Sequence, residues 1–424
     1  MSLPKVLKWL RPGLRIKRWI AVIFLGLGFF LLASYCFILF WTGTELKFDY
    51  PGKLLLIGSV AGYSLSCFCL ITGIYRLMKS MWGLVTDRRG GHKGLVDAAY
   101  ERAVLSAGPK VVAIGGGTGL SCVLTGLKDY SRDITAVVSM GDDGGSSGKL
   151  RQELNINPPG DVRKCLIALA DEEPLMSELL DFRFPEHELG GHNFGNLFLT
   201  ALARIRGDFG EGVREANRIL SVRGRVLPVT LEHVSLVATH EDDTKTTGQA
   251  AISKTQKRIR RLEIRPDPMP VAADIANAIE NADLIVVGPG SLYTSVIPNL
   301  LISGMCEALA RSKAKKVFVC NIMTYEGETR GYELADFLKA LDEHTYPHRI
   351  YDYVLVNKGK HGDTGIMAIK ERNAHPVHYD QKQYERSPFK LVACDVVNPA
   401  YPIRHDTMKL ARALMDINFE RVGF

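Results

Sequence analysis

Two long apolar runs near the N-terminus constrain this chain more than any other feature. No charged residue occurs from Ile20 to Trp41, and a second uncharged run extends from Leu54 to Tyr75. Because about 20 apolar helical residues cross the hydrocarbon core of a bilayer, we predict two transmembrane helices, over residues 20–41 and 54–75. A cleaved signal peptide is the alternative for the first run, but the run exceeds a usual signal core and no small-residue cleavage site follows it.

The basic residues of the chain gather beside these two runs. The formal net charge is +7, and residues 1–19 contain basic residues but no acidic one. A second basic group follows the second run, between Arg76 and Lys93. The positive-inside rule therefore predicts the inner (cytoplasmic) membrane, with segment 1–19 and everything after residue 76 in the cytoplasm. Since the remainder of the chain is roughly neutral, we expect no nucleic-acid partner.

After a polar linker over residues 76–109, the pattern becomes that of an α/β domain over residues 110–424. Short apolar runs of the buried-strand type alternate with segments compatible with helix, which predicts a parallel sheet. Residues 225–265 instead alternate like antiparallel strands and predict a β-rich insertion. The predicted parallel strands are Val111–Ile114, Ile134–Met140, Leu284–Val287, Val317–Cys320 and Tyr353–Val356, and those of the insertion are Val226–Thr230, His233–Thr239 and Ile259–Ile264.

Glycine, hydroxyl and amide residues follow several of these predicted strands. The first strand is followed by the glycine-rich run 115–119, and similar loops occupy residues 141–148, 190–197 and 288–295. Such a turn lets backbone N–H groups at a helix N-terminus approach a phosphate, although tight packing alone also selects glycine. Ligands of doubly wound sheets bind at the carboxyl edge of the strands. Because such residues follow several of the strands, we predict a site for a phosphorylated ligand at this edge.

Two neighbouring carboxylates, Asp142 and Asp143, follow the second strand. They can hold Mg²⁺, grip a ribose or act as a base, or they can belong to a solvated turn. In an extended segment they point in different directions, so we expect one of them to be structural. His192 is either a general acid/base or an ordinary turn histidine. Because no Ser-His-Asp order, P-loop lysine or zinc-type Cys/His spacing is present, catalytic residues stay unassigned and no metal site is predicted.

Seven motifs in one order give the chain a family resemblance. They are GGGTGLS at 115–121, GDDGGSSGKLRQEL at 141–154, PPGDVRK at 158–164, GGHNFGNL at 190–197, GRVLPVT at 224–230, GPGSLYTSVIPNLL at 288–301 and CNIMTYEGET at 320–329. Together they resemble the YvcK/CofD-like family, in particular its YvcK or gluconeogenesis-factor branch. The resemblance covers residues 110–360 and implies a Rossmann-like fold around a nucleotide ligand. The apolar hairpin departs from the soluble pattern of that family.

The two branches of the family imply different activities. YvcK-like members bind UDP-sugars such as UDP-N-acetylglucosamine and affect cell shape, wall precursor synthesis and gluconeogenic growth. CofD-like members transfer a phospholactyl group from a GDP-linked intermediate with Mg²⁺. The GDDGGSSGKLR and GRVLPVT segments favour the first branch, so we expect a ligand-binding regulator more than a transferase, without a certain cofactor. A protein partner in envelope synthesis is expected, and a homo-oligomer stays open, since Gly58 and Gly62 form a GxxxG motif.

The resemblance also implies roles for two side chains. Tyr293 would contact the uridine or the sugar, and its ring would stack on a base; Arg330 would bind the diphosphate. The full set of candidate ligand-binding residues is Gly116, Gly117, Thr118, Gly119, Asp142, Asp143, Gly144, Ser146, Ser147, His192, Asn193, Asn196, Gly288, Gly290, Ser291, Tyr293, Thr294, Ser295, Asn321 and Arg330. No role was expected for the last sixty residues or so.

Overall fold

The computed structural model describes residues 16–42, 52–85, 105, 108–171, 174–324, 327–359 and 375–420. The chain forms two compact units, residues 1–107 and 108–424. The basic segment before residue 16 and most of the predicted linker lie outside the described residues. The second unit begins within two residues of the predicted start of the α/β domain at residue 110.

The first unit contains two long apolar helices, α2 (Ile16–Thr42) and α3 (Gly52–Val85). Their candidate membrane spans are Arg18–Thr42 and Leu55–Arg76, with mean hydropathy 2.5 and 1.8. Only 11% of each span is buried, so the apolar side chains do not form the core of the described part. Both helices are long and apolar enough to cross a membrane, as predicted. Helix α3 continues beyond the predicted end at Tyr75.

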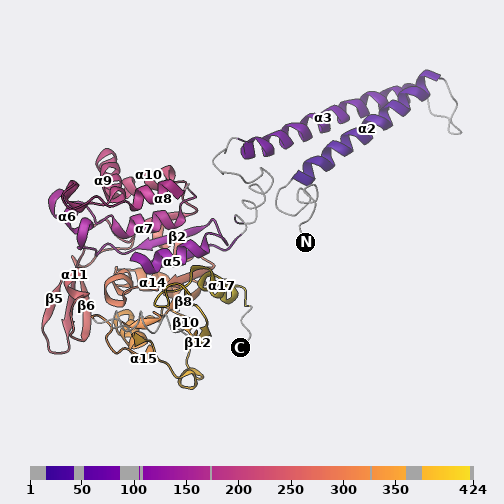
Figure 1. Ribbon diagram of the computed structural model, residues 1–424. Helices are drawn as coiled ribbons and strands as arrows, with labels where there is room; N and C mark the ends of the chain where they lie inside the picture. The colour runs from indigo at the N-terminus through magenta and orange to yellow at the C-terminus, as the bar shows by residue number, and fades with distance from the viewer. Residues whose placement is uncertain are drawn as a thin grey trace. The chain divides into compact units, whose positions relative to one another are not determined.

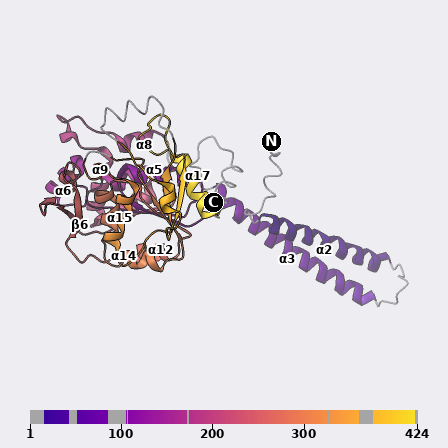
Figure 2. The ribbon, with the colours of Figure 1, turned by 90° about the horizontal axis from the view of Figure 1, so that it is seen from below.

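Small residues allow α2 and α3 to pack closely, and the two helices run side by side in both views (Figure 1 and Figure 2). A Cβ at Gly62 would lie 2.8 Å from the Cβ of Ala33, and one at Gly73 would lie 2.7 Å from Cγ1 of Ile23. A Cβ at Gly58 would meet nothing within 4 Å. Gly62 of the GxxxG motif therefore serves the contact within the hairpin, while Gly58 faces away from it.

The second unit is built on a seven-stranded parallel sheet with the order β12-β10-β8-β7-β1-β2-β3. Its strands are β1 (Val111–Gly115), β2 (Ile134–Val138), β3 (Arg225–Pro228), β7 (Leu284–Val287), β8 (Lys315–Val319), β10 (Tyr353–Asn357) and β12 (Lys390–Cys394). Every residue of β1, β2 and β7 is buried, as expected for strands covered on both faces. The predicted Rossmann-like fold class is confirmed.

Helices cover the sheet and connect its strands. They are α5 (Gly117–Leu127), α6 (Gly145–Leu154), α7 (Gly160–Leu169), α8 (Pro174–Asp181), α9 (Phe194–Arg206), α10 (Phe209–Ile219), α12 (Ala273–Glu280), α13 (Ile297–Leu300), α14 (Met305–Arg311), α15 (Leu334–Thr345) and α17 (Thr407–Asn418). Helices α8, α9 and α10 lie together at one end of the unit (Figure 1). Helix α5 contacts both α7 and α17, which brings the C-terminal helix beside the first glycine-rich turn.

The β-rich insertion is smaller than predicted. Strands β4 (Ser235–His240), β5 (Lys245–Thr247) and β6 (Ile259–Arg265) form an antiparallel sheet that carries the short helix α11 (Gln249–Ile252). The run Val226–Thr230 was predicted to be an antiparallel strand of the insertion, and this assignment is wrong. Strand β3 instead pairs parallel with β2 at the edge of the main sheet. Helices α9 and α10 precede β3 and provide the long crossover that a parallel strand needs. A small ladder joins β9 (Met323–Thr324) to β11 (His375–Pro376).

The strand order reverses between β1 and β7. The chain first adds β2 and β3 on one side of β1 and then returns to add β7, β8, β10 and β12 on the other side. The connections that follow β1 and β7 therefore lead the chain toward opposite sides of the sheet, and they start from neighbouring loops at its carboxyl edge. Such a switch point leaves a crevice in which open α/β sheets bind ligands.

Candidate functional site

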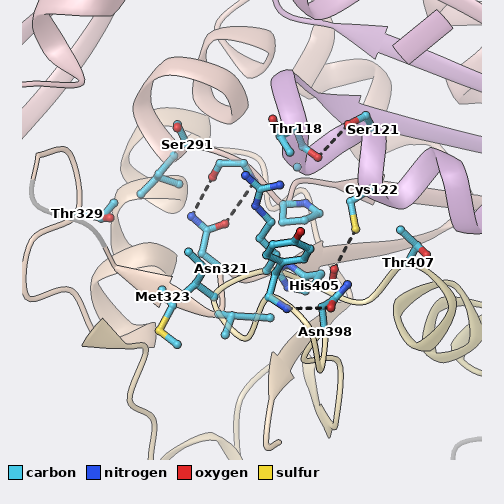
Figure 3. Close-up of a pocket in the computed structure, with 18 of the residues that line it drawn as sticks. Thr118, Ser121, Cys122, Ser291, Asn321, Met323, Thr329, Asn398, His405 and Thr407 are labelled. Carbon is cyan, nitrogen blue, oxygen red and sulfur yellow. Dashed lines mark hydrogen bonds between the residues drawn. The ribbon is translucent and has the colours of Figure 1, made fainter. Parts of the chain in front are cut away.

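A cavity of about 560 Å³ lies at the carboxyl edge of the sheet, beside the switch point. The loops after β1, β7 and β8 supply one part of its wall, and residues between 398 and 407 supply another. Figure 3 shows labelled side chains from these segments, among them Thr118, Ser291, Asn321 and Asn398, arranged around it. Of the predicted ligand-binding residues, Thr118, Gly119, Gly290, Ser291 and Asn321 line this cavity.

The first glycine-rich turn lies against the loop that follows β7. Helix α5 begins at Gly117, whose φ is +59°, a left-handed value that favours glycine. A Cβ at Gly119 would collide with the Pro289 carbonyl oxygen, so only glycine allows this close approach. Gly288, at φ +77°, turns the chain out of β7. The two predicted loops thus meet at the switch point.

Two buried or half-buried amides hold the β7 loop in place. Asn321 donates from Nδ2 to the Gly290 oxygen (3.0 Å) and accepts at Oδ1 from the Gly290 N–H (3.2 Å), as Figure 3 shows. Asn299, fully buried, donates from Nδ2 to the Gly115 oxygen (3.1 Å) and the Ser295 oxygen (2.7 Å). These bonds join the ends of β1, β7 and β8. They leave the Ser291 and Thr118 hydroxyls at the cavity wall.

The C-terminal wall of the cavity was not predicted. It includes Asn398, Tyr401, Arg404 and Thr407, which follow strand β12. The Asn398 N–H donates to the Arg404 oxygen (3.0 Å), and the Arg404 guanidinium carbon lies 6.0 Å from the Tyr401 ring centroid. Arg404 and Tyr401 are both exposed. The available signal was the Asn-Pro-Ala-Tyr-Pro turn after an apolar run at 390–394, which repeats the strand-end pattern.

Arg404 provides the positive charge of this cavity. Burial lowers the pKa of His405 to about 4, although a hydrogen bond to the Cys320 carbonyl opposes this shift. The His405 imidazole is therefore neutral at physiological pH. Among the described residues that line the cavity, Arg404 alone is then cationic, and it forms no ion pair with another described residue. A guanidinium beside glycine-rich loops suits a diphosphate.

Glu328 is the buried carboxylate of the cavity wall, and sequence reasoning did not select it. Its Oε1 accepts from Thr294 Oγ1 (2.6 Å) and Ser253 Oγ (3.1 Å), and its Oε2 accepts from the Tyr293 N–H (3.0 Å). Burial raises the pKa of the Glu328 carboxyl, while these hydrogen bonds oppose the shift. Glu328 therefore ties the β7 loop to the β-rich insertion, and Thr294 faces this carboxylate.

Two residues selected by resemblance do not reach the cavity. The Tyr293 side chain is only 2% exposed, and its hydroxyl bonds to Tyr332 (3.0 Å) and to the Ile259 oxygen (3.2 Å). In this structure the ring is therefore not exposed for the expected stacking on a base, because the π-helical turn Leu292–Val296 directs it into the core. Arg330 is exposed but lines a separate hollow, so its expected contact with a diphosphate in the main cavity is not available.

A second polar centre lies on the β2 side of the glycine-rich turn. A Cβ at Gly116 would lie 3.0 Å from Asp161 Oδ2 and 3.3 Å from the Ser295 Cβ. A Cβ at Gly160 would lie 2.9 Å from Asp142 Oδ2. Burial raises the pKa of Asp142, and the neighbouring charge of Asp161 adds to that shift. Sequence reasoning included Asp161 in a motif but not among the ligand-binding residues.

The two neighbouring carboxylates serve different purposes. Asp143 accepts from the Gln249 N–H (2.9 Å) and the Ala250 N–H (2.7 Å), so it anchors helix α11 of the β-rich insertion. Asp142 accepts from the Gly144 N–H (3.1 Å) and stays beside Asp161. The expectation that one of the pair is structural is met by Asp143.

The HNFGN motif packs against the start of helix α6. Ser146 Oγ contacts His192 Nδ1 (3.1 Å), accepts from Asn196 Nδ2 (3.1 Å) and accepts from the Asn193 N–H (3.3 Å). Ser147 Oγ accepts from the Gly160 N–H (3.1 Å). Ser146, Ser147, Asn193 and Asn196 are buried and His192 is half-buried, so these residues fix the GDDGGSS loop and do not line the main cavity. In the described part of the chain, no group of three or more His, Cys, Asp or Glu side chains is arranged to hold a metal ion.

Comparisons with known proteins show which family the chain resembles over most of its length. The family model described as "2-phospho-L-lactate transferase CofD" matches residues 111–397. The "Gluconeogenesis factor" of Bacillus subtilis is 44% identical over 314 residues, covering 73% of this chain and 98% of that protein. A relative from Nostoc sp. is 40% identical over 420 residues, 96% of this chain and 91% of that protein, and so the match includes the apolar helices.

A solved structure supports the fold of the second unit. The crystal structure of a UPF0052 family member from Bacillus halodurans has 42% sequence identity and a TM-score of 0.70. It covers 73% of this chain, and this chain covers 99% of that protein. The relative therefore folds without a counterpart of the apolar hairpin.

Proposed function

Because this chain belongs to the YvcK/CofD family, in the branch of the gluconeogenesis factors, we propose that it is a membrane-anchored regulator that binds UDP-N-acetylglucosamine in the cavity at the switch point. In this proposal, the occupied and empty cavity present different surfaces to a protein partner in envelope synthesis. The chain would thereby adjust cell shape, wall precursor synthesis and carbon metabolism. No covalent step is required.

The observation that carries the proposal is that Arg404 lines the same cavity as the glycine-rich loops after β1 and β7. The cavity volume of about 560 Å³ falls in the usual range for small-molecule sites. Thr118, Ser291 and Asn321 offer hydroxyl and amide groups for phosphate or sugar oxygens. Tyr401, beside Arg404, has an exposed ring, and in this proposal the uracil stacks on it.

Asp161 favours the same placement of the diphosphate. Its carboxylate lies beside Gly116 and Gly117, at the N-terminus of helix α5. A phosphate directly over these two glycines would meet a like charge, which is unfavourable without a bridging cation. The diphosphate would therefore lie toward Gly119, Gly290 and Arg404, away from the Asp142–Asp161 pair.

A phospholactyl transferase that uses a GDP-linked intermediate is the second candidate. The match to the CofD model and the close carboxylates Asp142 and Asp161 favour it, because paired carboxylates are suitable ligands of Mg²⁺. However, neither carboxylate lines the main cavity. Two carboxylates alone also leave most of an octahedral coordination shell to water or substrate.

Isothermal titration calorimetry of residues 108–424 tests the proposal, since the Bacillus halodurans relative shows that such a unit folds alone. We expect UDP-N-acetylglucosamine to bind with or without Mg²⁺ and Arg404→Gln to lose about tenfold or more in affinity, the cost of a charge-assisted contact. Arg412→Gln is the matched control, because Arg412 lies on α17 with its side chain 80% exposed. Stronger, Mg²⁺-dependent binding of GDP would instead support the transferase.

A further inference from the structure

A second hollow of about 200 Å³ lies behind the wall of the main cavity. It is lined by Gln256 and Arg258, which precede β6, and by residues of the segment Gly327–Gly331. The two spaces share Glu328: Thr329 faces the main cavity, whereas Gly327, Arg330 and Gly331 face the hollow. The Gly327–Gly331 segment therefore separates two potential binding sites.

The hollow contains two guanidinium groups. Arg330 is exposed and forms no ion pair or hydrogen bond with another described residue. Arg258 is held in place, since its Nη2 donates to Asp336 Oδ1 (2.6 Å) and its guanidinium lies 5.0 Å from the Tyr332 ring centroid. A guanidinium has five N–H donors, so the bond to Asp336 leaves others for a ligand.

The backbone of the hollow is accessible to a small anion. Gly327 has φ +122° and Gly331 has φ +68°, so glycine permits two sharp turns within five residues. A Cβ at Gly331 would meet nothing within 4 Å, which shows that open space adjoins this turn. Two arginines and two glycines that line one hollow suit an oxyanion that accepts several hydrogen bonds.

We propose that this hollow is a second ligand site, which binds the phosphate group of a small molecule and regulates the main cavity. Arg330 supplies the charge, Arg258 supplies the N–H groups that its bond to Asp336 leaves, and Gln256 supplies an amide donor. A phosphate dianion matches two guanidinium groups better than a single carboxylate does. The binding part of this inference is independent of the ligand of the main cavity, and the regulatory part rests on the proposed function.

Two hydrogen-bonded connections lead from the hollow to the β7 loop. Glu328 bonds to the Tyr293 N–H and to Thr294, both in the turn that follows Ser291. Tyr332, on which Arg258 lies, bonds through its hydroxyl to the Tyr293 hydroxyl (3.0 Å). A phosphate that binds both Arg330 and Arg258 would shift Glu328 and Tyr332, and with them the β7 loop. A coupling of this kind requires a different phosphate affinity in the two states of the main cavity.

The binding part is tested with the full chain in detergent micelles, titrated with inorganic phosphate by calorimetry at constant ionic strength. Wild type is expected to bind phosphate, and Arg330→Gln to weaken it about tenfold or more. Arg261→Gln is the control, since Arg261 is an exposed arginine of β6 that lines neither space. The proposal is overturned if wild type gives no binding at millimolar phosphate, or if Arg330→Gln binds as tightly as wild type.

The regulatory part is tested by titrating UDP-N-acetylglucosamine in the presence and absence of phosphate. The expected result is a change in its affinity in wild type that disappears in Arg330→Gln. Unchanged affinity in wild type contradicts regulation, and a change that persists in Arg330→Gln shows that phosphate competes in the main cavity. If UDP-N-acetylglucosamine does not bind at all, the proposed function fails while the phosphate titration still decides whether the hollow is a site.

Discussion

Asp142 lies beside Gly160 and near Asp161, in an environment that is unfavourable for its charge. Burial is the main cause of its raised pKa, and Asp161 adds a like charge. The hydrogen bond from the Gly144 N–H opposes the shift but does not reverse it. Perturbed carboxyl groups of this kind are typical of functional sites, where stability is lost in favour of binding.

We predict that Asp142→Asn makes the second unit more stable at neutral pH. Because the folded protein holds the Asp142 proton more tightly than the unfolded chain, stability falls as the pH rises from the ordinary value of 3.8 through the raised one. Asparagine removes this loss and can still accept from Gly144. Urea unfolding across pH 4 to 8 should show a gain that is largest near pH 7.5 and vanishes near pH 4. Lower stability of Asp142→Asn at neutral pH would contradict the unfavourable charge.

The type of a residue alone did not predict whether its side chain reaches the cavity. Thr118, Ser291 and Asn321 reach the cavity because their loops follow neighbouring strands. Tyr293, only two residues after Ser291, is buried because the turn there is π-helical. The direction of a side chain in an irregular turn depends on contacts such as the Glu328 carboxylate, which lies far away in sequence.

At the scale of elements, helices α2 and α3 pack closely because small residues lie at their contact. We predict that Gly62→Val separates α2 from α3, because its side chain would overlap Ala33 at a cost of about 1–3 kcal/mol. Gly58→Val, on the same helix, should have no such effect, since nothing lies within 4 Å of its Cβ position. Spin labels on the exposed Ile38 and Ile57 in reconstituted bilayers would report a broader distance distribution for Gly62→Val alone. An equal effect of both variants would disprove the packing.

Strand β3 illustrates the limit of element prediction from sequence. The run at 226–230 was identified as strand, yet its alternation did not reveal which sheet it joins. Helices α9 and α10 carry the chain back to the edge beside β2, and Val226 is completely buried there. Pairing between strands so distant in sequence is a tertiary decision, because no local pattern records the partner.

At the scale of the whole molecule, the chain combines two helices that are long and apolar enough to cross a membrane with an α/β unit that contains the candidate site. Relatives of different length support this division: the Bacillus subtilis protein matches 73% of this chain, whereas the Nostoc sp. protein matches 96%. In the proposed function, the two helices span the membrane and the α/β unit is cytoplasmic. The guanidinium carbon of Arg76 lies 5.5 Å from the ring centroid of Trp19, a pairing that suits a membrane interface.

We predict that the full chain stays with membranes after alkaline carbonate extraction and is released by detergent. Residues 108–424 alone should be recovered in the soluble fraction, because their apolar side chains form a buried core. Protease added to sealed inside-out vesicles should digest the α/β unit, as the positive-inside rule requires. Release of the full chain by carbonate would contradict spanning, and a mature N-terminus after Trp41 would identify the first helix as a signal peptide.

The sequence by itself determined the features that arise from local composition and period. Long uncharged runs are sufficient to predict helices α2 and α3, and short apolar runs ending in glycine, asparagine or aspartate are sufficient to predict the parallel sheet. Seven ordered motifs also identified the family. Each run and each motif lies within one short continuous segment of the chain.

Only the tertiary structure decided which loops share a cavity. Because β7 lies beside β1, the loops at 115–119 and 288–295 meet, while the HNFGN motif packs on Ser146 and serves the other side. The return of the chain through β12 and α17 brings Arg404 to the site and leaves Arg330 in a separate hollow. Strand order and crossovers are set by burial of the whole core, so they are not encoded in the spacing of any single motif.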